Sequence, residues 1–180
     1  MRITVSGLPG SGTTSLSRYL SERHGFSLIS AGEVFRQLAQ EHNMGLAEFG
    51  RLAQENPDFD TMIDARQKEI AEQRDNIIVE GRLSGWMVRD ADIRIWLFAP
   101  IGCRVKRIVL RDQIADDTTA ERITIEREKC EADRYRTYYN IDINDLSIYQ
   151  IILNSEHWSV DGLGSIIDTA IVQLNSHEAR

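Results

Sequence analysis

A glycine-rich stretch at residues 7–15 has the residue types and the spacing needed to bind phosphate. Its sequence is G-L-P-G-S-G-T-T-S, and Gly7 and Gly12 stand at the G-x-x-x-x-G spacing. Glycines let a backbone curl so that successive N–H groups point inward, and the start of a following helix adds partial positive charge. Thr14 occupies the Ser/Thr position whose hydroxyl reaches Mg²⁺ in such loops. The stretch therefore predicts a phosphate-binding loop (P-loop).

Thr13 departs from the usual P-loop pattern, because it stands where that pattern has a lysine. The lysine normally places a full positive charge on the β- and γ-phosphates of a nucleotide. Two interpretations follow: either the cation comes from elsewhere in the chain, or the loop binds nucleotide and catalyses poorly. The arginine-rich segment after Asp112 is the obvious alternative source of charge.

The elements around this loop predict an α/β protein with a parallel sheet. A β-branched run precedes Gly7, and apolar residues at helical spacing follow Thr13 and end near Gly25. Strands that alternate with helices imply right-handed crossovers and a parallel sheet covered on both faces. The five strand candidates are residues 2–6, 26–30, 77–80, 93–99 and 148–153, and residues 160–174 have the pattern of an amphipathic helix.

Two segments without strand signals lie between these candidates. Residues 32–74 carry apolar residues at helical period, which predicts an all-helical insertion. Residues 112–139 are dense in charge, and taken alone such a run is typical of a solvated helix face. With only three prolines and no repeat, nothing divides the 180 residues into separate domains.

Composition excludes several classes of function. The chain has 21 Lys+Arg against 28 Asp+Glu, a net charge of −7, which argues against a nucleic-acid or membrane partner. Cys103 and Cys130 fit no metal-ligand spacing, no histidines pair as in zinc sites, and no apolar run approaches a membrane span. We expect a cytoplasmic monomer. A local cluster of arginines can still hold a small anion inside an acidic protein.

Four further motifs resemble one enzyme family. Residues 30–36 (S-A-G-E-V-F-R) resemble the acceptor-binding element of nucleoside monophosphate kinases. Residues 79–86 (V-E-G-R-L-S-G-W), 127–139 (R-E-K-C-E-A-D-R-Y-R-T-Y-Y) and 141–149 (I-D-I-N-D-L-S-I-Y) are similar to elements of archaeal-type cytidylate kinases, which belong to the P-loop NTPases. A G-S-G-T-T loop is an expected variant among archaeal members. Asn140 stands where the family often has glycine, which bears on flexibility rather than on chemistry.

The resemblance implies a three-layer P-loop kinase fold with a five-stranded parallel sheet in a single domain spanning residues 1–180. The expected core covers about residues 1–31, 75–111 and 141–180. The insertion at about residues 32–74 would bind the acceptor nucleotide. The arginine-rich segment at about residues 112–140 would form a short lid over the site.

The resemblance also implies site roles. ATP phosphates, with Mg²⁺ on Thr14, would be held by Gly7, Leu8, Pro9, Gly10, Ser11, Gly12, Thr13, Thr14 and Ser15. CMP would be held by Ser30, Gly32, Arg36, Gly81 and Arg82. The catalytic arginines of the lid would be Arg127, Arg134 and Arg136. Glu80 either orients a metal-bound water or makes a structural contact.

Recognition of the base needs a group that accepts a hydrogen bond from the exocyclic amine of cytosine. Asp60 and Asp64 in the insertion are the candidates, and we expect one of them to accept this bond. The whole pattern predicts transfer of the γ-phosphate of ATP to CMP, and with it dCMP, giving CDP and ADP in pyrimidine nucleotide metabolism. The alternatives are another monophosphate kinase acting on AMP or UMP, and a non-catalytic nucleotide-binding protein with a P-loop weakened by Thr13.

Overall fold

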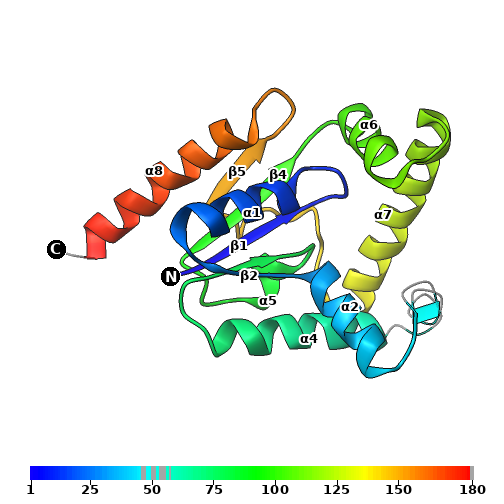
Figure 1. Cartoon of the computed structure of the whole chain (residues 1–180), viewed down its shortest axis with the longest axis horizontal. Helices are drawn as coiled ribbons and strands as arrows, with labels where there is room; N and C mark the ends of the chain where they lie inside the picture. Colours follow the sequence, from blue (N-terminus) through cyan, green and yellow to red (C-terminus); the bar gives the residue numbers. More distant parts are fainter. Residues whose placement is uncertain (46–47, 50–51, 53–55, 57, 179–180) are drawn as a thin grey trace.

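A five-stranded parallel sheet forms the centre of the molecule. The computed structural model in Figure 1 describes residues 1–45, 48–49, 52, 56 and 58–178. The strand order is β2-β3-β1-β4-β5, and every neighbouring pair is parallel. The strands are β1 (Arg2–Gly7), β2 (Ser27–Ser30), β3 (Ile77–Glu80), β4 (Ile93–Phe98) and β5 (Ile151–Asn154). The predicted five-stranded parallel sheet is therefore confirmed.

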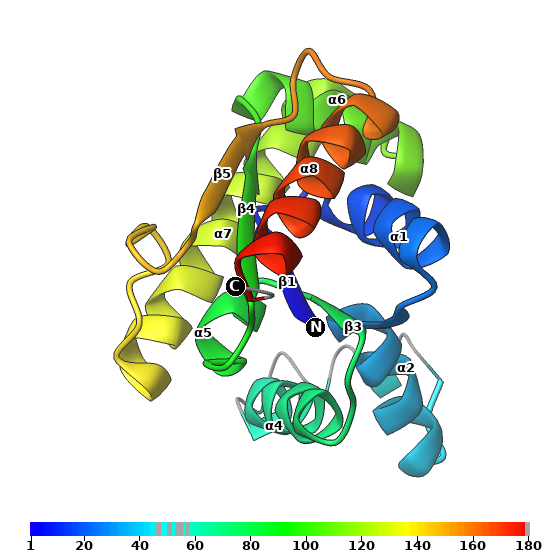
Figure 2. The same ribbon diagram turned by 90° about the vertical axis from the view of Figure 1, so that its left-hand side faces the viewer.

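Helices cover both faces of the sheet, as the near-continuous apolar strands require. They are α1 (Thr13–His24), α2 (Ala31–Glu41), α4 (Asp58–Glu72), α5 (Ser84–Met87), α6 (Ile101–Asp112), α7 (Asp117–Tyr139) and α8 (Val160–Glu178). Figure 2 shows α1 and α8 together on one side of the sheet, and α4, α5 and α7 on the other. No helix in the described part of the chain is long and apolar enough to cross a membrane.

Three apolar clusters hold these layers together. The first joins β1, β3 and β4 to α1 and α8, with Leu16 and Ile167 fully buried between them. The second joins β2 and β3 to α2 and α4. The third packs the C-terminal half of α7 against β4 through Tyr135, Trp96 and Tyr149. The end of α7 is thus part of the core.

Two local predictions differ from the structure. The fifth strand begins at Ile151 rather than at residue 148, because Tyr149 closes a turn by donating its backbone N–H to the Leu146 carbonyl. The charged segment is not solvated on every side, since α7 buries Thr124 and Glu131 on the face toward the core. Most of the segment predicted as the lid, residues 112–140, forms this one 23-residue helix.

The parallel strands end at one edge of the sheet, where they bring distant loops together. β1 ends at Gly7, which pairs with Leu97 of β4, and a Cβ at Gly7 would lie 2.4 Å from the Leu97 carbonyl oxygen. Only glycine allows this approach. α/β proteins bind their ligands at this carboxyl edge, so the glycine-rich loop after β1 marks the place to look for a site.

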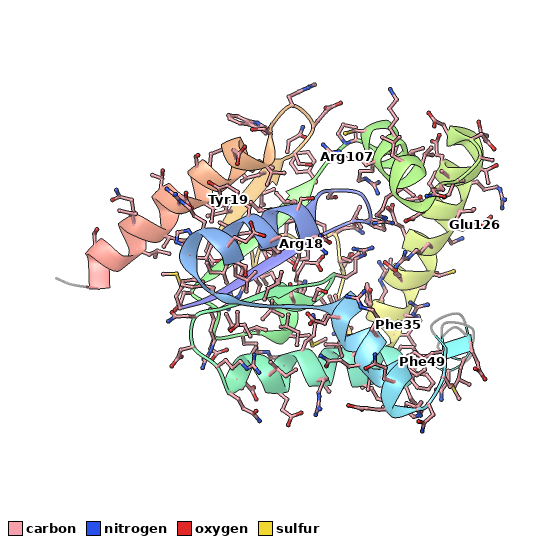
Figure 3. All side chains as sticks on the ribbon, in the orientation of Figure 1. Arg18, Tyr19, Phe35, Phe49, Arg107 and Glu126 are labelled. Carbon is pink, nitrogen blue, oxygen red and sulfur yellow. The ribbon has the colours of Figure 1, made fainter. Side chains whose placement is uncertain are left out.

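The contact between α1 and α8 gives a test of the fold. A Cβ at Gly164 of α8 would lie 2.0 Å from Cε1 of Tyr19 on α1, the residue labelled in Figure 3. We expect Gly164→Ala to lower the free energy of unfolding by about 1–3 kcal/mol, because the two helices must separate to admit the methyl group. Urea denaturation measures the change.

Gly102→Ala is the matched control, because no heavy atom lies within 4 Å of the Cβ position at Gly102 in α6. There the gain in helix propensity is expected to raise the free energy of unfolding by roughly 0.5–1 kcal/mol. Equal effects of the two substitutions would contradict the close contact between α1 and α8.

Candidate functional site

The backbone carbonyls of the glycine-rich loop all point toward hydrogen-bond donors. Two of these donors lie within the loop and its helix: Ser11 N–H bonds the Leu8 carbonyl and Leu16 N–H bonds the Gly12 carbonyl, both at 3.1 Å. The remaining carbonyls accept from side chains of other elements: Gly7 from Arg82 at 3.0 Å, Pro9 from Arg104 at 3.1 Å, Gly10 from Arg107 at 3.2 Å and Ser11 from Ser155 at 2.7 Å.

This arrangement fixes the shape of the loop. Gly10 and Gly12 have φ angles of +81° and +94°, which glycine adopts without strain. With each carbonyl from residue 7 to residue 12 bonded, the curl of the loop is held in one form. The N-cap residue of α1 is Gly12, which offers no side-chain acceptor to the first turn of the helix. The loop is therefore built to present backbone N–H groups to an anion.

Arg104 at the start of α6 is the most deeply placed of the supporting arginines. Its side chain is about 6% exposed, and it donates to the Ala99 carbonyl at 3.0 Å as well as to Pro9. It also forms an ion pair with Glu128 of α7. A Cβ at Gly10 would lie 2.7 Å from the Arg104 carbonyl oxygen, so the loop lies directly on α6.

Arg107, one turn further along α6, links the loop to the segment after β5. Its guanidinium donates to the Gly10 carbonyl and also to the Ser155 hydroxyl at 2.9 Å and carbonyl at 2.7 Å. Figure 3 labels Arg107. Neither Arg104 nor Arg107 was predicted from the sequence as a site residue. The available signal was the position of Arg104 on the same helical face as the apolar residue Ile108.

In place of the lysine, the chain buries a neutral hydroxyl against a carboxylate. Thr13 Oγ1 donates to Glu80 Oε1 at 2.7 Å, and the two residues are 7% and 9% exposed. Glu80 ends β3 next to β1, and its own carbonyl accepts from Gln67 of α4 at 2.9 Å. Thr14 and Ser15 are exposed residues in the first turn of α1.

Glu131 of α7 bridges two of the predicted site arginines. Its Oε2 accepts from Nε of Arg82 at 3.0 Å and its Oε1 accepts from Nε of Arg127 at 2.7 Å. The Glu131 side chain is only 8% exposed. Burial alone would raise the pKa of Glu131, but the charges and hydrogen bonds of Arg82 and Arg127 bring that pKa below its ordinary value. This carboxylate was not predicted from the sequence as a site residue.

The other two predicted lid arginines lie differently. Arg134 is half-buried, and a spacing of seven residues places it on the same face of α7 as Arg127. Arg136 is exposed and pairs with Asp142 at 3.6 Å, about half a turn around the helix from Arg127. The structure therefore brings Arg82 and Arg127 together, keeps Arg134 on their side, and separates Arg136 from them.

The predicted acceptor residues surround the start of α2. The hydroxyl of Ser30 caps this helix by accepting from the Glu33 N–H at 3.1 Å. Arg36 is exposed, and its Nη1 lies 3.8 Å from the Cβ position at Gly32, so its guanidinium lies over the first turn. Gly81 approaches Gln67, whose Oε1 lies 3.2 Å from the Cβ position.

The two base-recognition candidates both belong to α4. Asp64 Oδ2 accepts from the hydroxyl of Tyr139 at 2.9 Å, which joins α4 to the end of α7. Asp60 also lies on α4, but its side chain is outside the described residues. The partner of Asp64 was absent from the sequence prediction, because Tyr139 is 75 residues away.

Comparison with known sequences matches residues 2–157 to the model of the cytidylate kinase-like family. The cytidylate kinase of Methanoregula boonei is 75% identical over 174 residues, which cover 97% of this chain and 96% of that protein. The cytidylate kinase of Methanosphaerula palustris is 61% identical over 174 residues, which cover 97% of this chain and 99% of that protein.

Comparison with solved structures finds the same fold in more distant proteins. A shikimate kinase from Bacteroides thetaiotaomicron has a TM-score of 0.65 at 16% identity, with 95% of this chain and 98% of that chain covered. A deoxyadenosine kinase from M. mycoides with bound dATP has a TM-score of 0.57 at 13% identity, with 95% and 99% covered. These likenesses confirm the predicted kinase fold.

The support of the loop by Arg104 leads to a prediction of stability. Replacing Arg104 by Gln leaves the Glu128 carboxylate without its cation and weakens the bonds to two carbonyls. We expect Arg104→Gln to lower the free energy of unfolding by about 3 kcal/mol, because a half-broken buried ion pair costs more than the pair contributes. Urea denaturation at neutral pH measures this change.

Arg111→Gln is the control on the same helix, because Arg111 is 59% exposed and its ion pair is with the adjacent Asp112. Its expected effect stays within about 0.5 kcal/mol. Similar losses in both variants would show that Arg104 does not support the loop.

Proposed function

The chain belongs to the cytidylate kinase-like family, and on that premise we propose that it is an ATP-dependent kinase with CMP and dCMP as its acceptors. The reaction transfers the γ-phosphate of ATP and gives CDP, or dCDP, and ADP. The observation that carries the proposal is the loop at residues 7–12, in which every backbone carbonyl accepts a hydrogen bond. Arg82 donates to the Gly7 carbonyl, and Glu131 joins Arg82 to Arg127. Phosphoryl transfer depends mainly on such positioning and charge.

The donor half of the site would hold ATP on the loop and on the start of α1. The loop would supply backbone N–H groups to the phosphates, except at Pro9, which has none, and the helix adds the positive end of its dipole. Thr14 is exposed, and its neighbour Thr13 donates to the Glu80 carboxylate, so this position would suit Mg²⁺, which binds a few protein oxygens and completes its shell with phosphates and water. When bound, Mg²⁺ neutralises charge on the β- and γ-phosphates.

The positive charge of the missing lysine would come from arginines. Thr13 is neutral and already donates to Glu80, so it adds no charge to the phosphates. Arg127 and Arg134 on α7, with Arg82 after β3, would neutralise the transferred phosphoryl group. Guanidinium groups suit this role because they remain charged and offer several donors in one plane.

The acceptor half would lie between α2, α4 and the segment after β3. Arg36 and Arg82 would bind the phosphate of CMP, while Ser30, Gly32 and Gly81 allow its close approach. Asp64 would accept a hydrogen bond from the cytosine amine, with Tyr139 holding the other side of its carboxylate. We propose a cytoplasmic monomer, since a single chain carries all of these groups.

An acceptor screen tests the proposed activity. Coupled assays of ADP formation with ATP and Mg²⁺ should compare CMP, dCMP, UMP, AMP and GMP. We expect the highest kcat/KM with CMP, followed by dCMP, and loss of activity when EDTA removes Mg²⁺. A preference for AMP or UMP would identify a different monophosphate kinase. ATP binding by calorimetry without turnover on any acceptor would favour the non-catalytic alternative.

Base choice gives a separate prediction. Asp64→Asn is expected to lower the ratio of kcat/KM for CMP over UMP by roughly 10-fold, because an amide no longer offers two acceptor oxygens to the cytosine amine and Tyr139. Tyr139→Phe is expected to lower the same ratio less. Both ratios come from initial rates with each acceptor varied at saturating ATP.

Two further variants on α4 interpret the result. Asp60→Asn shows which of the two aspartates recognises the base, because only the aspartate that accepts a hydrogen bond from cytosine should lower the CMP-over-UMP ratio of kcat/KM when it is replaced. Glu69→Gln is the surface control, because Glu69 is 54% exposed and pairs with Arg66. An unchanged ratio in both aspartate variants would exclude them from base recognition.

A further inference from the structure

We infer that Glu131 is a positioning residue, which holds Arg82 and Arg127 side by side so that their terminal nitrogens remain available to the transferred phosphoryl group. The inference rests on the proposed kinase function and adds one residue to its machinery. Glu131 itself touches neither substrate, and it acts through the two arginines.

The hydrogen-bond geometry shows how one carboxylate serves two cations. Each oxygen takes one arginine: Oε2 accepts from Nε of Arg82 at 3.0 Å, and Oε1 accepts from Nε of Arg127 at 2.7 Å. Both arginines therefore bind through Nε, at the side of the guanidinium. A guanidinium carries five N–H donors, so donors on the terminal nitrogens remain for another anion.

Electrostatics explains why the carboxylate is needed. Two guanidinium groups at one carboxylate carry like charges that repel each other, and a negative group between them offsets this repulsion. The side chain of Glu131 is 8% exposed and that of Arg82 is 19% exposed, so water screens this cluster less than it screens a surface pair. Without the carboxylate, we expect Arg127, which is 57% exposed, to turn into solvent.

Arg82 extends the same cluster to the P-loop. Its Nη1 donates to the Gly7 carbonyl at 3.0 Å while its Nε donates to Glu131. Glu131 thus connects α7, the segment after β3 and the first residue of the loop. A neighbouring bond works in parallel, since Glu128, one turn earlier on α7, pairs with Arg104, which holds the Pro9 carbonyl.

The opposite role for Glu131 would be inhibition, in which its carboxylate occupies the place of a phosphate and must leave before substrate binds. Two observations oppose it. Both arginines donate to the carboxylate through Nε, so the carboxylate does not take up the donors on their terminal nitrogens. Tyr135, one turn further along α7, is buried in the third apolar cluster, which anchors this part of the helix. The two roles predict changes of opposite sign when the charge is removed.

Glu131→Gln is the central variant. The amide has one acceptor oxygen instead of two, and its NH₂ group would face a guanidinium donor. We expect kcat with CMP to fall by at least about 10-fold and the Kd for CMP to rise roughly 3- to 10-fold. The Kd for ATP should change by less than about 2-fold, because the loop N–H groups are retained.

Two companions make the result specific. Glu131→Asp keeps the charge and shortens the reach, so its kcat should lie between those of the wild type and Glu131→Gln. Glu126→Gln removes a carboxylate from the same helix, where Glu126 is 65% exposed and pairs with Arg122 at 3.4 Å, and it should leave kcat unchanged. Figure 3 labels Glu126 on α7. If Glu131→Gln fails to fold, the comparison rests on Glu131→Asp.

A double-mutant cycle separates positioning from general stability. If Glu131 acts through Arg127, Glu131→Gln should lower kcat far less in an Arg127→Ala background than in the wild type. Additive losses would overturn the inference, and so would a tighter Kd for CMP or a higher kcat in Glu131→Gln. Absence of turnover by the wild type would instead refute the proposed function. In that case the role of Glu131 would be judged only from the Kd values of the variants for CMP and ATP.

Discussion

The structure depends on supplying a hydrogen-bond donor to each backbone carbonyl of the loop at residues 7–12. A buried backbone carbonyl without a donor is costly, so each of these oxygens must find one. Four of these carbonyls accept hydrogen bonds from side chains outside the loop, namely three arginines and a serine. These donors come from the segment after β3, from α6 and from the segment after β5. The strand order brings those segments to one edge of the sheet, so the conformation of the loop depends on the topology of the sheet.

The same constraint accounts for the distribution of charge. An acidic chain with a net charge of −7 directs several of its arginines inward. Arg82 and Arg104 each bind one loop carbonyl and one carboxylate of α7, and this pairing is what makes their burial tolerable. A lysine at position 13 would add another cation beside them. The chain instead has a threonine that donates to Glu80.

Helix α7 connects the parts of the site that must act together. Glu128 and Glu131 bind the two arginines that hold loop carbonyls, and Tyr139 binds Asp64 of α4 at the proposed acceptor side. Tyr135 anchors this helix in the core, so all of these contacts are made by one packed element. A segment that resembles a solvated surface in its charge pattern is thus a structural connection between the proposed donor and acceptor sites.

The sequence alone determined what depends on local physics. Glycine spacing indicated the loop, short β-branched or apolar runs indicated the five strands, and the motif containing Arg82 and the arginine-rich segment indicated the sources of charge. Only the tertiary structure decided which charges are used and what supports them. Arg104 and Arg107 bind carbonyls 95 and 97 residues away, and Glu131 meets Arg82 across 49 residues. No periodicity in the chain encodes such pairs, because they exist only where the ends of parallel strands bring separate segments together.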